Sequence, residues 1–116
     1  MAIPSGSGTE VLKVSTATIT SNSATDLITG VANHIYTVLS VNICETGAQG
    51  EAMDLYVHDD GSTIYYLIRN HTLPAYGTFV YNDKLVLSGT DRLTLQFGSS
   101  CDIDVVVSYI DQDWSS

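Results

Sequence analysis

Apolar and polar side chains alternate with a period of two along much of the chain, most clearly over residues 33–45. Such a period sends successive side chains to opposite faces of a β-strand. The segment contains no Gly or Pro, which suits a central strand rather than an edge strand. We therefore predict a long central strand here. Its expected core-facing residues are Ile35, Leu39, Val41 and Ile43, and the apolar exceptions on the other face are Val38 and Cys44.

Shorter alternating segments follow at intervals of about 8–12 residues, with turns rich in Gly, Asn, Asp and Ser between them. No segment has a helical period. We expect eight or nine strands, at residues 10–20, 24–29, 33–45, 51–58, 63–69, 78–81, 84–87, 92–97 and 101–110. This pattern predicts an all-β fold, an antiparallel β-sandwich of jelly-roll type.

The chain divides into a sandwich and two short flanking segments. A sequence of 116 residues is the length of one domain, which we place at residues 9–110. Residues 1–8 are rich in Gly and Ser and form an extended N-terminal arm that either frays or orders against a neighbouring subunit. Residues 111–116 form a polar C-terminal tail that contains Trp114, the only tryptophan.

The charge balance excludes several classes of partner. Four Lys or Arg residues stand against thirteen Asp or Glu, which gives a formal net charge of -9. Four scattered cations cannot form the basic stripe that a phosphate backbone requires, so we expect no nucleic-acid binding. The same charge disfavours anionic membrane surfaces, and no apolar run reaches the roughly 18 residues of a membrane span.

The sequence offers no convincing catalytic or metal site. His34, His58 and His71 lie on different segments, without metal-ligand spacing. The Asp59–Gly61 turn lacks the later ligands of a calcium loop. Two cysteines without Cys-x-x-Cys spacing indicate buried free thiols. We therefore predict no enzyme, no metal ion and no cofactor.

The tyrosines suggest a protein that associates with others. Seven tyrosines occur in this small domain, and Tyr56, Tyr65 and Tyr66 surround one hairpin. Tyrosine is amphipathic and enriched at protein interfaces, although the rings could also cover the sandwich edges of a monomer. The expected partner-binding residues are Ile3 and Pro4 in the arm, Tyr56, Tyr65 and Tyr66 in the hairpin, and Trp114 in the tail.

Four segments resemble small virion proteins of tailed bacteriophages. These are residues 3–12 (IPSGSGTEVL), 36–47 (YTVLSVNICETG), 73–79 (LPAYGTF) and 102–111 (DIDVVVSYID). The resemblance implies a non-enzymatic structural protein, first of all a capsid decoration or cement protein. Such proteins are β-rich, often homotrimeric, and sit outside the head where capsomers meet. The implied partner is the major capsid protein of the shell, and an acidic domain suits a place outside the shell, away from packaged DNA.

Two other interpretations remain open at this stage. A tail, neck or fibre-associated protein of a phage would have the same composition. A carbohydrate-binding module would use Tyr65, Tyr66 or Trp114 as a stacking platform, and an exposed coplanar aromatic pair would favour it. The first residues lack the basic and apolar regions of a secretory signal, so we expect assembly in the host cytoplasm.

Overall fold

The computed structural model describes residues 9–60 and 63–114, which form nine strands. The strands are β1 (Thr9–Ile19), β2 (Thr25–Thr29), β3 (His34–Glu45), β4 (Glu51–Asp59), β5 (Thr63–Leu73), β6 (Thr78–Tyr81), β7 (Leu85–Ser88), β8 (Arg92–Phe97) and β9 (Ile103–Asp113). The described residues contain no helix, and so none that could cross a membrane. The predicted all-β fold is confirmed.

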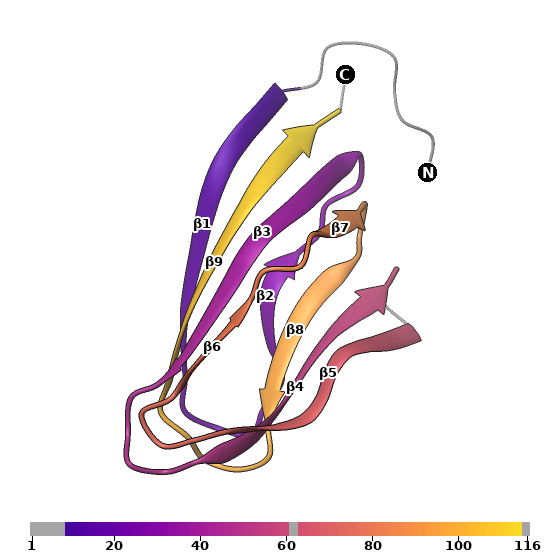
Figure 1. Ribbon diagram of the computed structural model, residues 1–116. Coiled ribbons are helices and arrows are strands. Elements are labelled where there is room, and N and C mark those ends of the chain that lie inside the picture. Colours follow the sequence, from indigo (N-terminus) through magenta and orange to yellow (C-terminus); the bar gives the residue numbers. More distant parts are fainter. Residues whose placement is uncertain (1–8, 61–62, 115–116) are drawn as a thin grey trace.

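The strands form two antiparallel sheets that face each other (Figure 1). Sheet A has the order β1-β9-β3-β6, with β7 also paired to β3, and sheet B has the order β2-β8-β4-β5. Because β6 and β7 both pair with β3, they act as two halves of one interrupted strand. The pairs β1–β9, β2–β8, β3–β6/β7 and β4–β5 are then nested, which fits the expected jelly-roll type.

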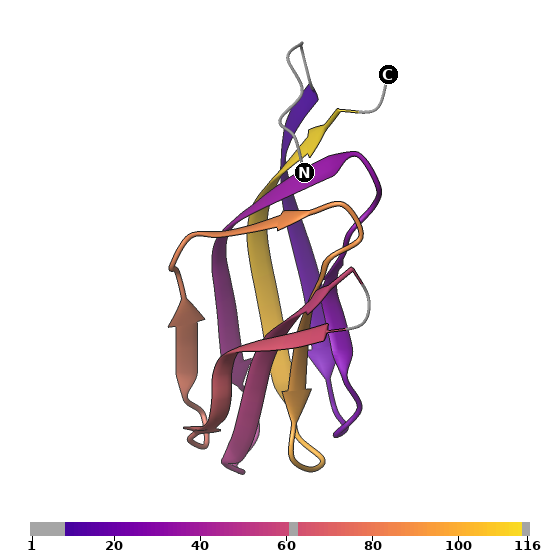
Figure 2. The same ribbon diagram turned by 90° about the vertical axis from the view of Figure 1, so that its right-hand side faces the viewer.

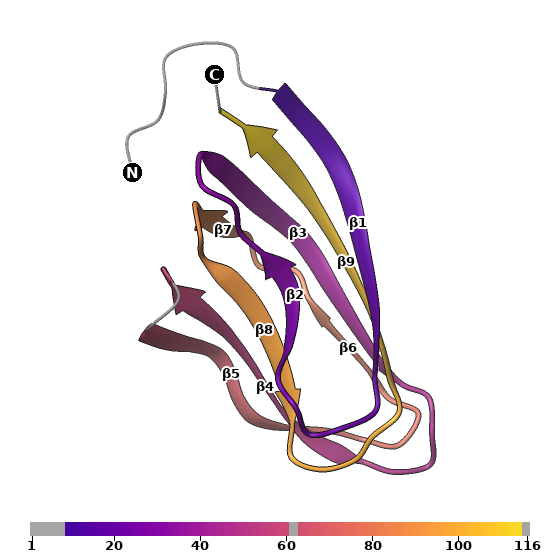
Figure 3. The ribbon, with the colours of Figure 1, turned by 180° about the vertical axis from the view of Figure 1, so that it is seen from behind.

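The core lies between the sheets and is formed by the inward residues of both. It includes Val41 and Ile43 of β3, Leu93 and Leu95 of β8, and Ile103, Val105 and Val107 of β9, all no more than 1% exposed. Figures 1 and 3 show that the sheets diverge toward the end where β1 begins and β9 ends. At that end Thr9 pairs with Asp113, so both ends of the described chain lie together. Figure 2 shows β5 crossing in front of sheet A at an angle.

The central strand β3 has the expected position but not the expected faces. Val41 and Ile43 point inward as predicted, whereas Leu39 is 40% exposed and Val38 is fully buried. The register with β9 shifts between Val38 and Ser40, so Leu39 is the extra residue of a β-bulge. A bulge reverses the side-chain alternation beyond it. Tyr36 and Val38 therefore face the core, in place of Ile35 and Leu39.

Two strand ends also differ from the expectation. The strand expected to end at Arg69 continues to Leu73, through two register shifts in the β4–β5 ladder. The last strand continues to Asp113, three residues into the segment expected to be a tail. Asp111 is buried at its end, bound by Lys13 and His34, so polar residues there are paired rather than free. Composition alone had marked that segment as polar.

Candidate interaction surfaces

The outer face of sheet A carries aliphatic side chains and no charge over its central rows. Strand register aligns the outward side chains into three rows: Leu12–Ile110–Thr37–Val86, Val14–Ser108–Ser40 and Thr16–Val106–Asn42–Val80. We call these rows, together with Leu39, the aliphatic face. Along β1 and β9, charge returns only beyond the rows, at Glu10 and at Asp104.

Six aliphatic residues of this face are each at least 40% exposed, unlike the buried residues of the core. Their exposed fractions are 74% for Leu12, 66% for Val14, 61% for Val86, 47% for Val80, 41% for Val106 and 40% for Leu39. Contiguous exposed apolar surface commonly marks a site of recognition. The aliphatic face is therefore a candidate interaction surface.

A charged cluster on the inner side of sheet A ties its edge strand β1 to the neighbouring strands. Lys13 Nζ donates to Asp111 Oδ2 over 2.8 Å, and His34 Nδ1 lies 2.7 Å from Asp111 Oδ1. Burial by itself raises the pKa of Asp111, but the hydrogen bonds and charges of Lys13 and His34 outweigh it and lower that pKa below its usual value. The cluster thus joins β1, β9 and β3 at the open end of the sandwich.

The aromatic rings beside this cluster extend the same contact. His34 stacks on Tyr36 with 5.8 Å between ring centroids, and Tyr36 lies 6.1 Å from Tyr109. The hydroxyl of Tyr36 accepts a hydrogen bond from the backbone N–H of Val31 over 3.1 Å. Burial raises the pKa of Tyr36 above its usual value.

The outer face of sheet B is a network of hydrogen-bonded polar side chains, which we call the polar face. Asp26 of β2 accepts from the hydroxyl of Thr94 over 2.8 Å and pairs with Arg92 over 3.2 Å. Tyr56 donates its hydroxyl to Gln96 Oε1 over 3.0 Å. Because each group is paired within the protein, the network locks β2, β8 and β4 together.

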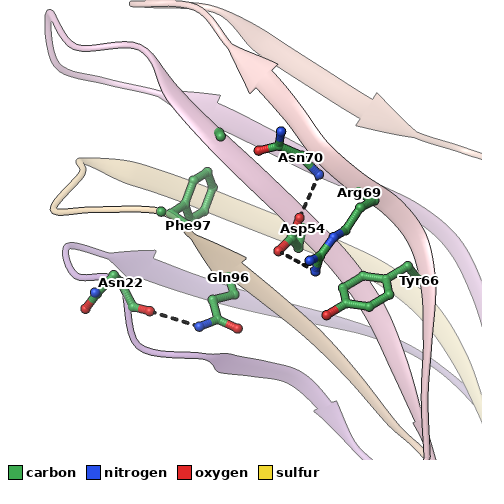
Figure 4. Close-up of a pocket in the computed structure, with 9 residues that line it drawn as sticks. Asn22, Asp54, Tyr66, Arg69, Asn70, Gln96 and Phe97 are labelled. Carbon is green, nitrogen blue, oxygen red and sulfur yellow. Dashed lines mark hydrogen bonds and ion pairs between the residues drawn. The ribbon is translucent and has the colours of Figure 1, made fainter.

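The polar face continues into a pocket of about 350 Å³, shown in Figure 4. Asp54 Oδ1 accepts from the backbone N–H of Asn70 over 2.7 Å, and Asp54 Oδ2 pairs with Arg69 over 3.4 Å. The Arg69 guanidinium lies 4.3 Å from the centroid of the Tyr66 ring. Gln96 donates its amide to the carbonyl of Asn22 over 3.2 Å. The side chains of Asp54, Arg69 and Gln96 are thus bonded within the protein, as the dashed lines of Figure 4 show.

A buried carboxylate organises the loops at the closed end of the sandwich. Glu45 is 1% exposed, and its two oxygens accept from the backbone N–H groups of Tyr76 (3.0 Å) and Gly47 (3.1 Å). Tyr76 has a φ of 56°, a backbone conformation that aromatic residues rarely adopt. Its side chain is 69% exposed. Glu45 therefore holds Tyr76 outward at a loop tip, a candidate contact that sequence reasoning did not select.

The structure separates the tyrosines that the sequence grouped together. Tyr65 and Tyr66 are 56% and 47% exposed, but successive residues of β5 point to opposite faces. Tyr56 is only 4% exposed and lies under Tyr66, with 5.3 Å between ring centroids. A partner can therefore reach Tyr65 and Tyr66 but not Tyr56. No coplanar exposed pair exists among these three rings.

The remaining expected contact residues lie at or beyond the ends of the described chain. Ile3 and Pro4 fall outside the described residues. Trp114 is half-buried, and its backbone N–H donates to the carbonyl of Asn33 over 2.9 Å. The buried indole nitrogen of Trp114 has no hydrogen-bond partner in the structure. Trp114 directly follows β9 of sheet A, whereas the tyrosine hairpin is formed by β4 and β5 of sheet B.

The two cysteines are free thiols in different environments. Cys101 is buried, and burial raises the pKa of its thiol above the usual value. Cys44 is half-buried on the outer side of sheet A, one residue before Glu45. Within residues 9–60 and 63–114, no group of three His, Cys, Asp or Glu side chains is placed to hold a metal ion.

No family model matches the chain, and no curated protein matches its sequence. Its fold, however, is similar to those of several solved structures. A pilus subunit of Bacillus endospore appendages, described as a novel family of disulfide-linked pili, matches at a TM-score of 0.61 and 13% identity, over 99% of this chain and 97% of that one. A chain of the acid-stable capsid of Helicobacter pylori bacteriophage KHP30 matches at 0.55 and 12%, over 94% and 95%.

A chain of the T13 IBDV viral particle also matches, at a TM-score of 0.57 and 9% identity. The match covers 90% of this chain but 31% of the viral chain, so this protein corresponds to less than a third of it. At such low identities the three likenesses show a shared fold. The fold thus occurs in capsids and in a pilus. The resemblance to virion proteins had implied a β-rich fold.

Proposed function

We propose that this protein is a non-enzymatic structural component of a bacteriophage particle. The observation that carries the proposal is the match to a chain of the KHP30 capsid over nearly the whole length of both chains. The sequence resemblance to small virion proteins points the same way. The exposed aliphatic face also supports it, because repeated assembly requires surface that folding leaves uncovered.

Within this class, a decoration or cement protein on the outer surface of the head is the role we favour. Its partner would be the major capsid protein, and it would act by adding buried area across capsomer joints. Each contact is weak, but many symmetric copies sum their effects. The net charge of -9 suits a position away from packaged DNA. We propose a homo-oligomer, for which the resemblance implies three copies.

The proposed contact residues follow from exposure. Tyr65 and Tyr66 remain candidates in the hairpin, and Tyr76 joins them at the closed end. Ile3 and Pro4 in the arm and Trp114 near the C-terminus remain candidates as the sequence suggested. The buried Tyr56 would contribute by supporting Tyr66 from below.

Imaging tests this role directly. Purified, labelled protein is mixed with isolated phage heads and with isolated tails, and its position is determined by electron microscopy. Label at regular sites over the outer shell is the expected result, and deletion of residues 1–8 should weaken it. Label on tails alone would replace the head role with the tail, neck or fibre role. Binding to neither would contradict a virion function.

A second candidate is a subunit of a protein fibre. The pilus subunit of Bacillus endospore appendages matches over 99% of this chain, which favours the candidate. The expected sign is filaments in electron micrographs of the concentrated protein alone. A carbohydrate-binding role has less support, because Tyr65 and Tyr66 point to opposite faces and Arg69 covers one side of the Tyr66 ring.

A further inference from the structure

We propose that two copies of the protein pair through their aliphatic faces. The inference concerns the free protein in solution, so it depends neither on the virion role nor on the three copies proposed for the particle. It starts from the six exposed aliphatic side chains and the three charge-free rows of sheet A. Water contact at these side chains is unfavourable, and covering them is the main gain available to this surface.

The free edge of sheet A is protected in a way that the aliphatic face is not. Among the described strands, β1 pairs only with β9, so its other edge could accept a foreign strand. Lys13 in the middle of β1 points to the inner side and is held by Asp111, and a charge there opposes edge pairing. Two residues further along β1, the Ser15 hydroxyl donates to the carbonyl of Leu27, which brings β2 against β1. The β1 edge is therefore less open to association than the aliphatic face.

The charge distribution determines which faces two copies can bring together. Two copies each carry a net charge of -9 and repel each other at long range. The central rows of the aliphatic face carry no charge. The polar face, in contrast, carries the charged side chains of Asp26, Asp54, Arg69 and Arg92. Copies that meet through the aliphatic face keep their carboxylates at the rim, where water and salt screen them.

The size of the face sets the strength to expect. Four strands at about 4.8 Å spacing and three rows of side chains cover roughly 400 Å² per copy. A specific interface of standard size buries about 800 Å² per partner. The pair is therefore a weak one, with a dissociation constant of about 10⁻⁵ M or above. Two identical faces pack about a two-fold axis, as an intermolecular sandwich.

Sedimentation equilibrium of the full chain, up to about 1 mM, tests the pairing. The test variant is Val106→Glu, which places a charge in the centre of the aliphatic face at a residue that is 41% exposed. The matched control is Ile64→Glu, at a residue of the same 41% exposure that points outward from sheet B. Both positions are open to solvent, so we expect both variants to fold. Circular dichroism checks this.

We expect wild-type mass to rise from 12.5 kDa toward twice that value with concentration. Val106→Glu should raise the dissociation constant at least about tenfold, and Ile64→Glu should change it by less than about twofold. Added salt should tighten the pair, because it screens the repulsion between copies. Three results would each overturn the proposal. The first is a monomer at all concentrations, which would leave the aliphatic face to another kind of partner. The others are a three-copy assembly that is insensitive to Val106→Glu, and a pair that is disrupted by Ile64→Glu alone.

Discussion

The two outer faces of the sandwich differ in how their side chains are satisfied. On the polar face, Thr94 is fully buried although it points away from the core, and its hydroxyl is bonded to Asp26. On the aliphatic face, Leu12 and Val14 are more than 60% exposed and have no charged neighbours in their rows. The polar face is therefore complete in the monomer, and its groups contribute to folding. The aliphatic face is incomplete, and its groups contribute little until something covers them.

The largest expected effect comes from the polar face. Tyr56→Ala removes a ring that is 4% exposed and packs against Tyr66 and His58. The cavity and the lost packing should lower the free energy of unfolding by about 3–5 kcal/mol. Denaturant titration measures it, with Tyr65→Ala as a control at a ring that is 56% exposed. Equal effects of the two substitutions would contradict the division between buried and exposed tyrosines.

The next effect tests how sheet A holds its edge strand. Asp111→Asn weakens the contacts to Lys13 and His34 and should cost about 1–2 kcal/mol at pH 7. The folded pKa of Asp111 lies below the usual 3.8. Its contribution is therefore present above pH 3.8 and is lost as the pH falls through the lower, folded value. Wild type should lose more stability than Asp111→Asn over that acid range, whereas Asp83→Asn, at an exposed residue, should behave as wild type.

A smaller effect should follow from a single hydroxyl of the polar face. Thr94→Val keeps the shape of the side chain but removes the donor to Asp26, at a position with no exposure. We expect a loss of about 1 kcal/mol, because Arg92 still pairs with Asp26. Thermal unfolding of the variant beside wild type measures this. An unchanged midpoint would show that the network contributes nothing to the fold.

The smallest effect should come from the aliphatic face. Val14→Ser changes a residue that is 66% exposed, so the stability of the dilute monomer should stay within about 0.5 kcal/mol of wild type. The same substitution should weaken pairing at high concentration. A large loss of monomer stability would mean that Val14 already has partners within the chain, contrary to the account given above.

The sequence predicted the strands better than their faces. Residues 92–97 form a strand with the expected bounds, and Leu93, Leu95 and Phe97 point inward as the alternation indicated. Alternation failed at Leu39, because a bulge inserts one residue and no residue type in the segment signals it. Tyr56 was expected to bind a partner, but the neighbouring strand places Tyr66 against its ring and leaves it 4% exposed.

The aliphatic face was harder to see because it joins strands far apart in the sequence. Val106 and Ile110 occupy outward positions of the last strand beside Asp104 and Ser108, and polar neighbours made that side look solvated. Only the register of β9 with β1 and β3 aligns them with Leu12 and Thr37. The contact of Glu45 with the Tyr76 loop is similarly long in range, because the partners are 31 positions apart in the sequence.

Hydroxyl-radical footprinting tests the difference between the two faces most directly. Side-chain oxidation is compared between the dilute and the concentrated protein, and again with phage heads present. We predict protection of Leu12, Val14 and Val86 on concentration, with Ile64 and Tyr66 oxidised as before. Protection of Ile64 and Tyr66 with no change on the aliphatic face would contradict the claim that folding completes one face and association the other.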